Sequence, residues 1–179
     1  MKNFNEENIP DIDEIFSKIQ KELSDFKKIK KFTFNELFIK TNRNEFSTNL
    51  VLIKKYYENF ITDNDFKGLY IFYENDIAIY VGISKKILRR IKQHFLSNSH
   101  FSASLVYLIA REKHDESIGF YNDDRENFPF ENYREEIQNN MRNNWKISLL
   151  SENDNYILYL KEIYISCKLK TYWNSFATH

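Results

Sequence analysis

Apolar and polar residues alternate most regularly in the middle of the chain. Residues 68–82 read GLYIFYENDIAIYVG, so two apolar runs flank a short Glu-Asn-Asp segment. Because Asn and Asp favour turns, the pattern predicts two antiparallel strands joined by a three-residue turn over that segment. Gly68 would then pair with Gly82, and Tyr70 with Tyr80. One face of this hairpin would be apolar, while the other would carry two phenol hydroxyls beside two glycines that leave room for an approaching group.

A helix is predicted directly after the second strand, with Ser84 as its N-cap. Four apolar residues at helical spacing define its buried side: Ile87, Leu88, Ile91 and Phe95. Arg90 and His94 are four residues apart, so they would lie together at the edge of this stripe and reach the polar face of the hairpin. Three other basic residues would point away, toward solvent or a polyanion: Lys85, Arg89 and Lys92.

The rest of the pattern predicts further helices and strands. Helical periodicity occurs in four ranges, which are 11–30, 46–61, 131–144 and 154–170. Apolar runs rich in strand-forming residues predict strands at 104–110 and 145–150. Residues 111–130 are polar and predict a long loop, whereas 32–40 fits a strand or a helix.

These elements predict an α+β protein with a small central sheet. The sheet would be antiparallel or mixed, would contain the hairpin 68–82 and one or two further strands, and would be flanked by helices. A length of 179 residues suits about one domain. We divide the chain into an N-terminal helical extension, 1–66, and a domain, 67–179. Since no glycine- or proline-rich linker separates them, we expect the extension to pack on the domain.

A carboxylate in an apolar row of the last predicted helix is a second chemical signal. Glu162 shares this row with Leu158, Ile165 and Leu169. Placing a charge there costs several kcal/mol unless it is paired, protonated or bound to a metal. Two interpretations stay open on these grounds. Glu162 is a functional metal ligand, or it reaches solvent at the helix edge or pairs with Arg90.

The order of these residues resembles the GIY-YIG nuclease family. That family has GIY, then YIG about ten residues later, an arginine on the next helix and a later helical glutamate. This chain has GLY at 68–70, YVG at 80–82 and Arg90 on the following helix. Leucine and valine replace isoleucine, and the spacer is slightly shorter, which a tighter turn would absorb. The resemblance covers about residues 67–176 and leaves out the N-terminal third.

The resemblance implies an active site for phosphodiester hydrolysis. Its residues would be Tyr70, Tyr80, Arg90, His94, Glu162 and Asn174. Glu162 matches the metal-binding glutamate of the family and would hold one Mg²⁺ or Mn²⁺ ion per active site. Arg90 would bind a phosphate oxygen, and His94 would relay a proton or contact the phosphate.

The two tyrosines would position the attacking water by the same resemblance. Tyr70 would be the general base, with its pKa lowered by nearby cationic groups. Asn174, which matches the asparagine after the family's last helix, would orient Glu162 or the phosphate. Lys85, Arg89 and Lys92 would contact nucleic acid.

Composition and charge limit where nucleic acid could bind and which classes of protein remain. The chain has 26 basic and 26 acidic residues, so its net charge is zero and any basic surface must be local. The single cysteine excludes a disulfide framework. The N-terminus lacks a secretion signal, and no apolar stretch is long enough for a membrane helix. We therefore expect a soluble, cytoplasmic protein with no membrane partner.

The leading hypothesis is a divalent-metal-dependent endonuclease that cuts DNA in a restriction, defence or mobile-element role. The arginine-histidine spacing of Arg90 and His94 resembles the restriction-endonuclease branch of the family. A homodimer would allow one active site per chain to cut both strands. Two alternatives stay open: a catalytically inactive nucleic-acid-binding or assembly module on the same fold, and a structure-specific repair or RNA nuclease.

Overall fold

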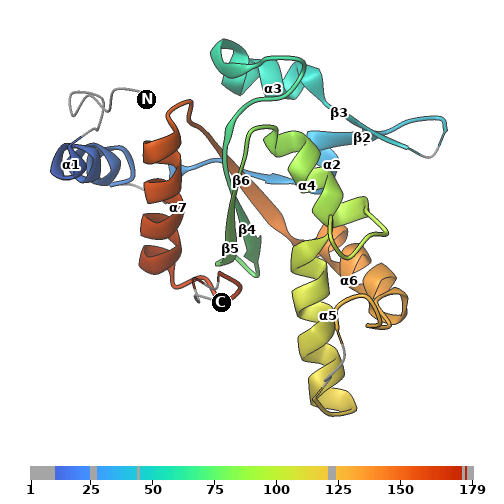
Figure 1. Ribbon diagram of the computed structural model, residues 1–179. Helices are drawn as coiled ribbons and strands as arrows, with labels where there is room; N and C mark the ends of the chain where they lie inside the picture. The colour runs from blue at the N-terminus through green and yellow to red at the C-terminus, as the bar shows by residue number, and fades with distance from the viewer. Residues whose placement is uncertain (1–10, 25–27, 44, 121–123, 175, 177–179) are drawn as a thin grey trace, which may run out of the picture.

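A four-stranded antiparallel sheet lies at the centre of the molecule (Figure 1). The computed structural model describes residues 11–24, 28–43, 45–120, 124–174 and 176. The strands are arranged in the order β1-β6-β4-β5. Their bounds are Lys31–Thr33 for β1, Gly68–Glu74 for β4, Ile77–Ser84 for β5 and Lys146–Ser151 for β6. The predicted α+β class is therefore confirmed, as is the strand expected at 145–150.

Helices cover both faces of this sheet (Figure 1). One face is covered by α1 (Ile12–Glu22) and α7 (Asn155–Leu169). The other is covered by α4 (Ile87–Leu96), α5 (Ser104–Ser117) and α6 (Glu131–Asn144). Because strand side chains alternate, Leu69 and Ile71 pack toward α1 and α7, while Tyr70 and Phe72 pack toward α4. Among the described residues, no helix has the length and apolar character needed to cross a membrane.

The turn of the hairpin is shorter than the sequence analysis predicts. Asn75 and Asp76 alone form it, and both have left-handed backbone conformations, with φ of 50° and 64°. These conformations suit a two-residue hairpin turn, which Asn and Asp tolerate better than most residues. The shorter turn moves the strand pairing by one position, so that Glu74 lies opposite Ile77. A bulge farther along adds a second position, and Tyr70 lies opposite Gly82 while Tyr80 lies opposite Phe72. The predicted pairs Gly68–Gly82 and Tyr70–Tyr80 are wrong.

A bulge in β5 keeps the two tyrosines on one face despite this shift. The register changes between Phe72 and Tyr73, so Ile79 has no partner of its own between Ala78 and Tyr80. One extra residue in a strand reverses the faces of the residues beyond it. Tyr80 consequently packs in the same core as Phe72, and Ala78 packs in the opposite one with Tyr73.

The strand predicted at 104–110 is wrong, because these residues begin α5. The apolar run SLVYLIA fits both structures, and only packing decides between them. In the helix Leu105, Val106 and Ala110 are buried against the core. Because α5 continues to Ser117, the predicted loop starts later than residue 111. The helix predicted at 131–144 is confirmed as α6.

The N-terminal third contains strands as well as helices. The helix predicted at 11–30 ends at Glu22, and the one predicted at 46–61 is replaced by β3 (Phe46–Thr48), α3 (Leu50–Tyr57) and a 3₁₀ turn (Glu58–Phe60). The ambiguous segment 32–40 forms the end of β1, then α2 (Phe34–Leu37) and β2 (Phe38–Lys40). β2 and β3 pair in a separate two-stranded sheet.

The central sheet extends across the predicted boundary between 66 and 67. Phe32 of β1 lies opposite Ile147 of β6, and its side chain is fully buried. The boundary itself stays a prediction. The sheet nevertheless takes one of its four strands from the segment that precedes it.

A buried lysine attaches α1 to α7. Lys161 is 1% exposed, and its Nζ lies 2.8 Å from Glu22 Oε1 and 2.8 Å from Glu152 Oε2. Glu22 is the last residue of α1, and Glu152 directly follows β6. An amino group this deep in the protein requires such partners, because burying an unpaired charge is costly. Lys161 therefore joins three elements at one point.

Candidate active site

Tyr70 and His94 form a buried hydrogen-bonded pair at the centre of the candidate site. Tyr70 lies on β4 and His94 on α4, and Tyr70 Oη is 2.9 Å from His94 Nε2. The side chains are 1% and 0% exposed. The predicted helix side that carries Arg90 and His94 thus does face the hairpin, and the predicted apolar stripe of this helix is buried.

Burial keeps both partners of this pair neutral. It raises the pKa of Tyr70 well above its usual value; neighbouring Tyr80 adds to the rise, and the Arg90 charge opposes it. Burial also lowers the pKa of His94 well below its usual value, and the Arg90 charge lowers it further. The predicted lowering of the Tyr70 pKa by cationic neighbours is therefore wrong for the protein alone, because desolvation outweighs the arginine.

Gly82 makes room for the ring of Tyr70. A Cβ atom at position 82 would lie 2.4 Å from both Cζ and Oη of Tyr70. At Gly68 a Cβ atom would lie 2.1 Å from the carbonyl oxygen of Leu150 on the neighbouring strand. Both glycines of the motif thus allow a close approach within the protein. The space that the sequence analysis reserved for an approaching group at Gly82 is occupied by Tyr70 itself.

Tyr80 lies beside this pair on the edge strand β5. Its ring centroid is 6.1 Å from that of Tyr70 and 5.8 Å from that of His94. Burial raises the pKa of Tyr80, Arg90 opposes the rise and Glu162 adds to it. The charges of Arg90 and Glu162 therefore both act on the pKa of Tyr80.

Arg90 is held by the segment that leads into α5. Its Nη1 donates to the carbonyl oxygen of Ser102 at 2.8 Å and to Gln93 Oε1 at 3.3 Å, and its Nη2 donates to Ser104 Oγ at 2.8 Å. Neither serine was predicted as a site residue, although a serine-rich run, SNSHFSAS at 97–104, follows the helix. The guanidinium is thereby fixed before any substrate arrives, as a preorganised charge donor should be.

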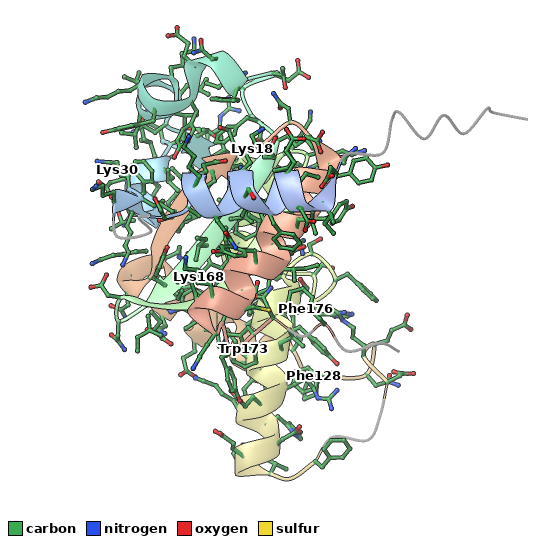
Figure 2. All side chains as sticks on the ribbon, turned by 90° about the vertical axis from the view of Figure 1, so that its left-hand side faces the viewer. Lys18, Lys30, Phe128, Lys168, Trp173 and Phe176 are labelled. Carbon is green, nitrogen blue, oxygen red and sulfur yellow. The ribbon has the colours of Figure 1, made fainter. Side chains whose placement is uncertain are left out.

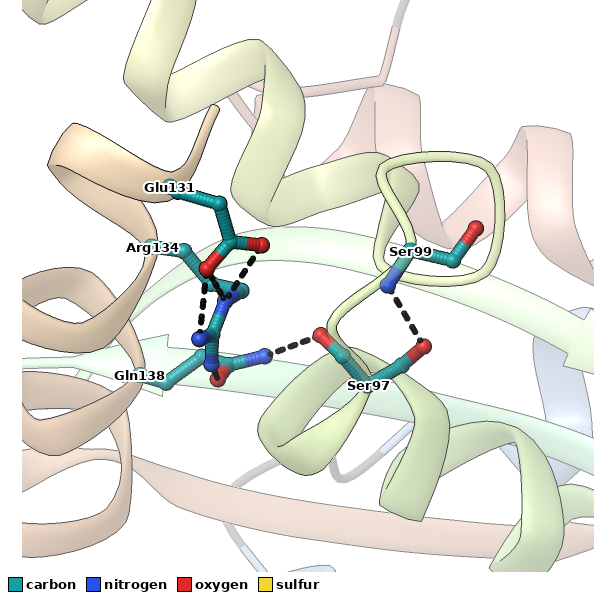
Figure 3. A network of polar contacts seen from close by, with 5 residues as sticks. All are labelled: Ser97, Ser99, Glu131, Arg134 and Gln138. Atoms are coloured by element: carbon teal, nitrogen blue, oxygen red, sulfur yellow. Dashed lines mark hydrogen bonds and ion pairs between the residues drawn. The ribbon is translucent and has the colours of Figure 1, made fainter. Parts of the chain in front are cut away.

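A polar network from α6 fixes the end of α4 that carries His94. Gln138 is 2% exposed, and its Nε2 donates to the carbonyl oxygens of Ser97 at 2.9 Å and His94 at 3.2 Å. Arg134 donates to Gln138 Oε1 at 3.2 Å and forms an ion pair with Glu131 at 2.7 Å (Figure 3). This network was also missed, because neither its spacing nor its composition marks it as functional.

Glu162 lies on the helix that covers the opposite face of the sheet, and its charge acts on Tyr80. It lies on α7 and is half-buried, and burial raises its pKa above the ordinary value. Within the described chain it has no hydrogen bond or ion pair, so the alternative in which it pairs with Arg90 finds no support. Asp154 caps this helix, accepting from the Ile157 amide.

The donor set around Glu162 fits a largely hydrated cation. The described residues contain no cluster of three or more His, Cys, Asp or Glu side chains suited to a metal. Mg²⁺ is commonly bound through one or two carboxylates together with waters and substrate phosphates. A single unpaired carboxylate is consistent with that mode of binding, in which the substrate completes the coordination.

Asn174 is bonded to the edge of β5. Its Oδ1 accepts from the Val81 amide at 2.7 Å, and its Nδ2 donates to the Val81 carbonyl at 2.8 Å. Thr171 Oγ1 also donates to Oδ1, at 2.9 Å. Asn174 thus binds β5 at Val81, the residue after Tyr80, and attaches its own segment to the strand there. Its predicted role in orienting Glu162 or a phosphate stays a prediction.

The start of α4 is capped from outside the helix. The predicted N-cap Ser84 is wrong, since the N-cap residue is Lys86. Asp65 instead accepts from the amides of Leu88 and Arg89, both at 2.9 Å. A carboxylate here is stabilised by the positive end of the helix dipole. Asp65 was not predicted as a cap, because it lies 23 and 24 residues before these amides.

The predicted nucleic-acid-binding side chains lie on the outer side of α4 or just before it. Lys85 and Arg89 are exposed, and Lys92 is half-buried. The arginine next to the site, Arg90, is turned inward by comparison. The prediction that adjacent arginines point in different directions is therefore confirmed.

A family model described as the GIY-YIG catalytic domain matches residues 66–157. Comparisons with curated proteins and with solved structures gave no match. The matched segment includes Tyr70, Tyr80, Arg90 and His94, and it ends before Glu162. It spans just over half of the 179 residues, and proteins with this domain are nucleases that generally depend on divalent metals. The chain therefore belongs to the GIY-YIG nuclease family.

Proposed function

We propose that the protein is a divalent-metal-dependent endonuclease that hydrolyses phosphodiester bonds in DNA. The observation that carries this proposal is the hydrogen bond between Tyr70 and a neutral His94, with the Arg90 charge acting on both groups. A neutral tyrosine and a neutral histidine at 2.9 Å form a path along which a proton can move. An arginine beside that path supplies the positive charge that a phosphate requires.

The roles of the residues follow from their chemistry. Tyr70 takes a proton from the attacking water while its own proton passes to Nε2 of His94, which is unprotonated at neutral pH because its pKa is lowered. Arg90 donates to a non-bridging phosphate oxygen, and Tyr80 orients the water. Glu162 would hold one Mg²⁺ or Mn²⁺ ion per active site, whose charge offsets that on the phosphate and the leaving oxygen. Asn174 fixes the strand that carries Tyr80.

We further propose a restriction, defence or mobile-element role in the cytoplasm. The spacing of Arg90 and His94, which resembles the restriction-endonuclease branch, supports this role. A homodimer would place two such sites on the two strands of a duplex. No basic surface is indicated by the overall charge, so binding to DNA would depend on a local surface.

The burial of Tyr70 favours a second candidate function. With an exposed fraction of 1%, Tyr70 is almost fully covered in the protein alone, so no substrate reaches its hydroxyl without a movement of its neighbours. A protein on this fold that binds nucleic acid without cutting it would have the same buried pair. The two candidates differ in whether phosphodiester bonds are broken.

A plasmid assay separates the two candidates. Supercoiled plasmid is incubated with the protein in Mg²⁺ and, in parallel, in EDTA, and the Glu162→Gln variant purified in the same way controls for contaminating nucleases. Nicked or linear product that requires both Mg²⁺ and Glu162 supports the endonuclease. Binding of plasmid without cleavage in Mg²⁺ or Mn²⁺ supports the binding module. Single-stranded DNA and RNA substrates, with the product ends sequenced, test the repair and RNA-nuclease alternatives.

A further inference from the structure

The outer side of α4 forms one wall of a groove, and the N-terminal third of the chain forms the other. The larger part of the groove is a cavity of about 500 Å³ between α4 and residues of β3 and the turn at 63–65. Arg89, Lys92 and Gln93 line it from the helix, and Thr48 and Asn64 line it from the opposite wall. A second cavity of about 420 Å³ continues it along β3, because both cavities share Lys92.

The groove is linked to Arg90 of the candidate active site through one side chain. Gln93 lines the larger cavity and accepts a hydrogen bond from Arg90 Nη1 at 3.3 Å. Arg90 in turn acts electrostatically on Tyr70 and His94. A chain lying in the groove would therefore pass within one side chain of the arginine that is proposed to bind the scissile phosphate.

The charges in the groove suit a polyanion. Lys86, Arg89 and Lys92 share the groove with three carboxylates, those of Asp63, Asp65 and the exposed Glu45. Asp65 is 7% exposed, and it is already engaged by backbone amides at the start of α4. Asp63 is exposed and lies 3.9 Å from Lys86. Arg89 and Lys92 are left to bind an incoming anion.

A separate, acidic cavity lies next to the hairpin. It has a volume of about 390 Å³ and lies between α5, α6 and the end of β4. Four glutamates line it, with one lysine: Glu74, Glu112, Glu116, Glu136 and Lys113. Phosphates would be repelled there, so a protein with zero net charge still presents a preferred path for nucleic acid on the α4 side.

We propose that this groove binds the phosphodiester backbone of DNA on one side of the scissile phosphate, and that the N-terminal segment serves as a wall of the substrate channel. The inference rests on the proposed function and assigns a role to residues 46–65, which lie before the family domain. Arg89 and Lys92 contact phosphates from one wall. Thr48 and Asn64 confine the strand from the other.

Two neighbouring residues of β3 provide a matched test. Thr48 is half-buried and lines the groove, while Ser47 is exposed and lies on the other side of the strand. Thr48→Glu and Ser47→Glu add the same charge at adjacent positions. Affinity for a fluorescein-labelled DNA duplex is measured by anisotropy in EDTA. We expect binding to weaken at least ~10-fold for Thr48→Glu and less than ~2-fold for Ser47→Glu.

A second pair keeps the inference testable if Thr48→Glu fails to fold. Lys92→Gln removes a charge from the groove, and Lys18→Gln removes one from α1, on the opposite face of the sheet (Figure 2). Neutralising one phosphate contact should make the slope of log K against log salt shallower by about 0.9. We expect this change for Lys92→Gln and an unchanged slope for Lys18→Gln.

The outcomes separate this inference from the proposed function. Equal effects of Thr48→Glu and Ser47→Glu in folded proteins, or equal salt slopes for the two lysine variants, would overturn the channel. Mg²⁺-dependent cleavage by the unaltered protein would then still support the endonuclease. An unaltered protein that neither binds nor cuts DNA would refute both.

Discussion

Arg90 is fixed by three hydrogen-bond acceptors and faces the Tyr70–His94 pair. Arg90→Ala should lower the rate of DNA cleavage by at least ~10²-fold, because it removes a preorganised charge from the phosphate site. Single-turnover cleavage rates measure this loss, and a thermal melt shows whether the variant is folded. A folded Arg90→Ala protein that cuts at nearly the unaltered rate would remove Arg90 from the mechanism.

Arg89 is the natural control for Arg90, since it is adjacent in sequence and exposed on the other side of the helix. Arg89→Ala should mainly weaken DNA binding and make it less dependent on salt, while cleavage of bound DNA continues. Binding is measured by anisotropy and cleavage at saturating protein. Loss of cleavage with unchanged binding would mean that Arg89 acts in the chemistry.

Glu162 is half-buried without an ion pair among the described residues, and its pKa is raised by burial. Glu162→Gln should abolish Mg²⁺-dependent cleavage, because the carboxylate is the proposed metal ligand. In EDTA near neutral pH, its melting temperature should match or exceed that of the unaltered protein, because a poorly solvated charge is gone.

The difference in stability between Glu162→Gln and the unaltered protein should depend on pH. A carboxyl whose pKa is raised on folding stabilises the fold below its ordinary pKa of 4.5 and loses this contribution as pH rises through the folded value. The advantage of Glu162→Gln should therefore grow as pH rises above about 4.5 and shrink below it. A variant that is clearly less stable at neutral pH but still active would mark Glu162 as a structural residue.

At the scale of elements, the buried Lys161 holds α1, α7 and the end of β6 together. Lys161→Met should lower the free energy of unfolding by about 3 kcal/mol or more, since it leaves the largely buried Glu152 unpaired. Lys113→Met is the control: its ion pair with Glu136 has the same 2.8 Å distance but is exposed. Its loss should cost about 0.5 kcal/mol or less.

Urea unfolding measures both changes. Adding Glu152→Gln to Lys161→Met should recover a large part of the loss, because the unpaired charge is then removed. Similar costs for the buried and the exposed lysine would show that burial does not determine the strength of this contact.

Helices and strands with a clear periodicity in their own residues could be predicted from the sequence. Arg90 and His94 could be placed together by helical spacing, whereas Tyr70 and Tyr80 share a face only because a bulge offsets the shorter turn, which spacing did not predict. Residues 104–110 could not be assigned, since a short apolar run is a strand or a helix depending on what it packs against. Asp65, Ser102 and Gln138 were missed because each acts on a part of the chain that only the fold brings near.

In the whole molecule, the N-terminal third supplies one strand of the central sheet and the Asp65 carboxylate that caps α4. A fragment of residues 67–179 lacks β1 with Phe32, and it lacks the Asp65 cap of α4. We expect this fragment to lose cooperative unfolding, because the core face beneath Phe32 becomes exposed. Circular dichroism melts of the fragment and the full chain measure this. A fragment that melts cooperatively near the temperature of the full chain would establish the boundary at 66 and 67.

The side-chain amide of Asn174 has a consequence for how copies of this protein can associate. β5 is one of the two edge strands of the central sheet, and such an edge offers free backbone groups to a strand of another molecule. Asn174 bonds to both backbone groups of Val81, and the Trp173 amide donates to the Ile79 carbonyl at 3.0 Å. The segment that contains Trp173 and Asn174 thus occupies backbone groups of β5 that a strand of another molecule would need. Two copies could merge their sheets through β5 only by displacing it, so a dimer that cuts both DNA strands would have to form through another surface.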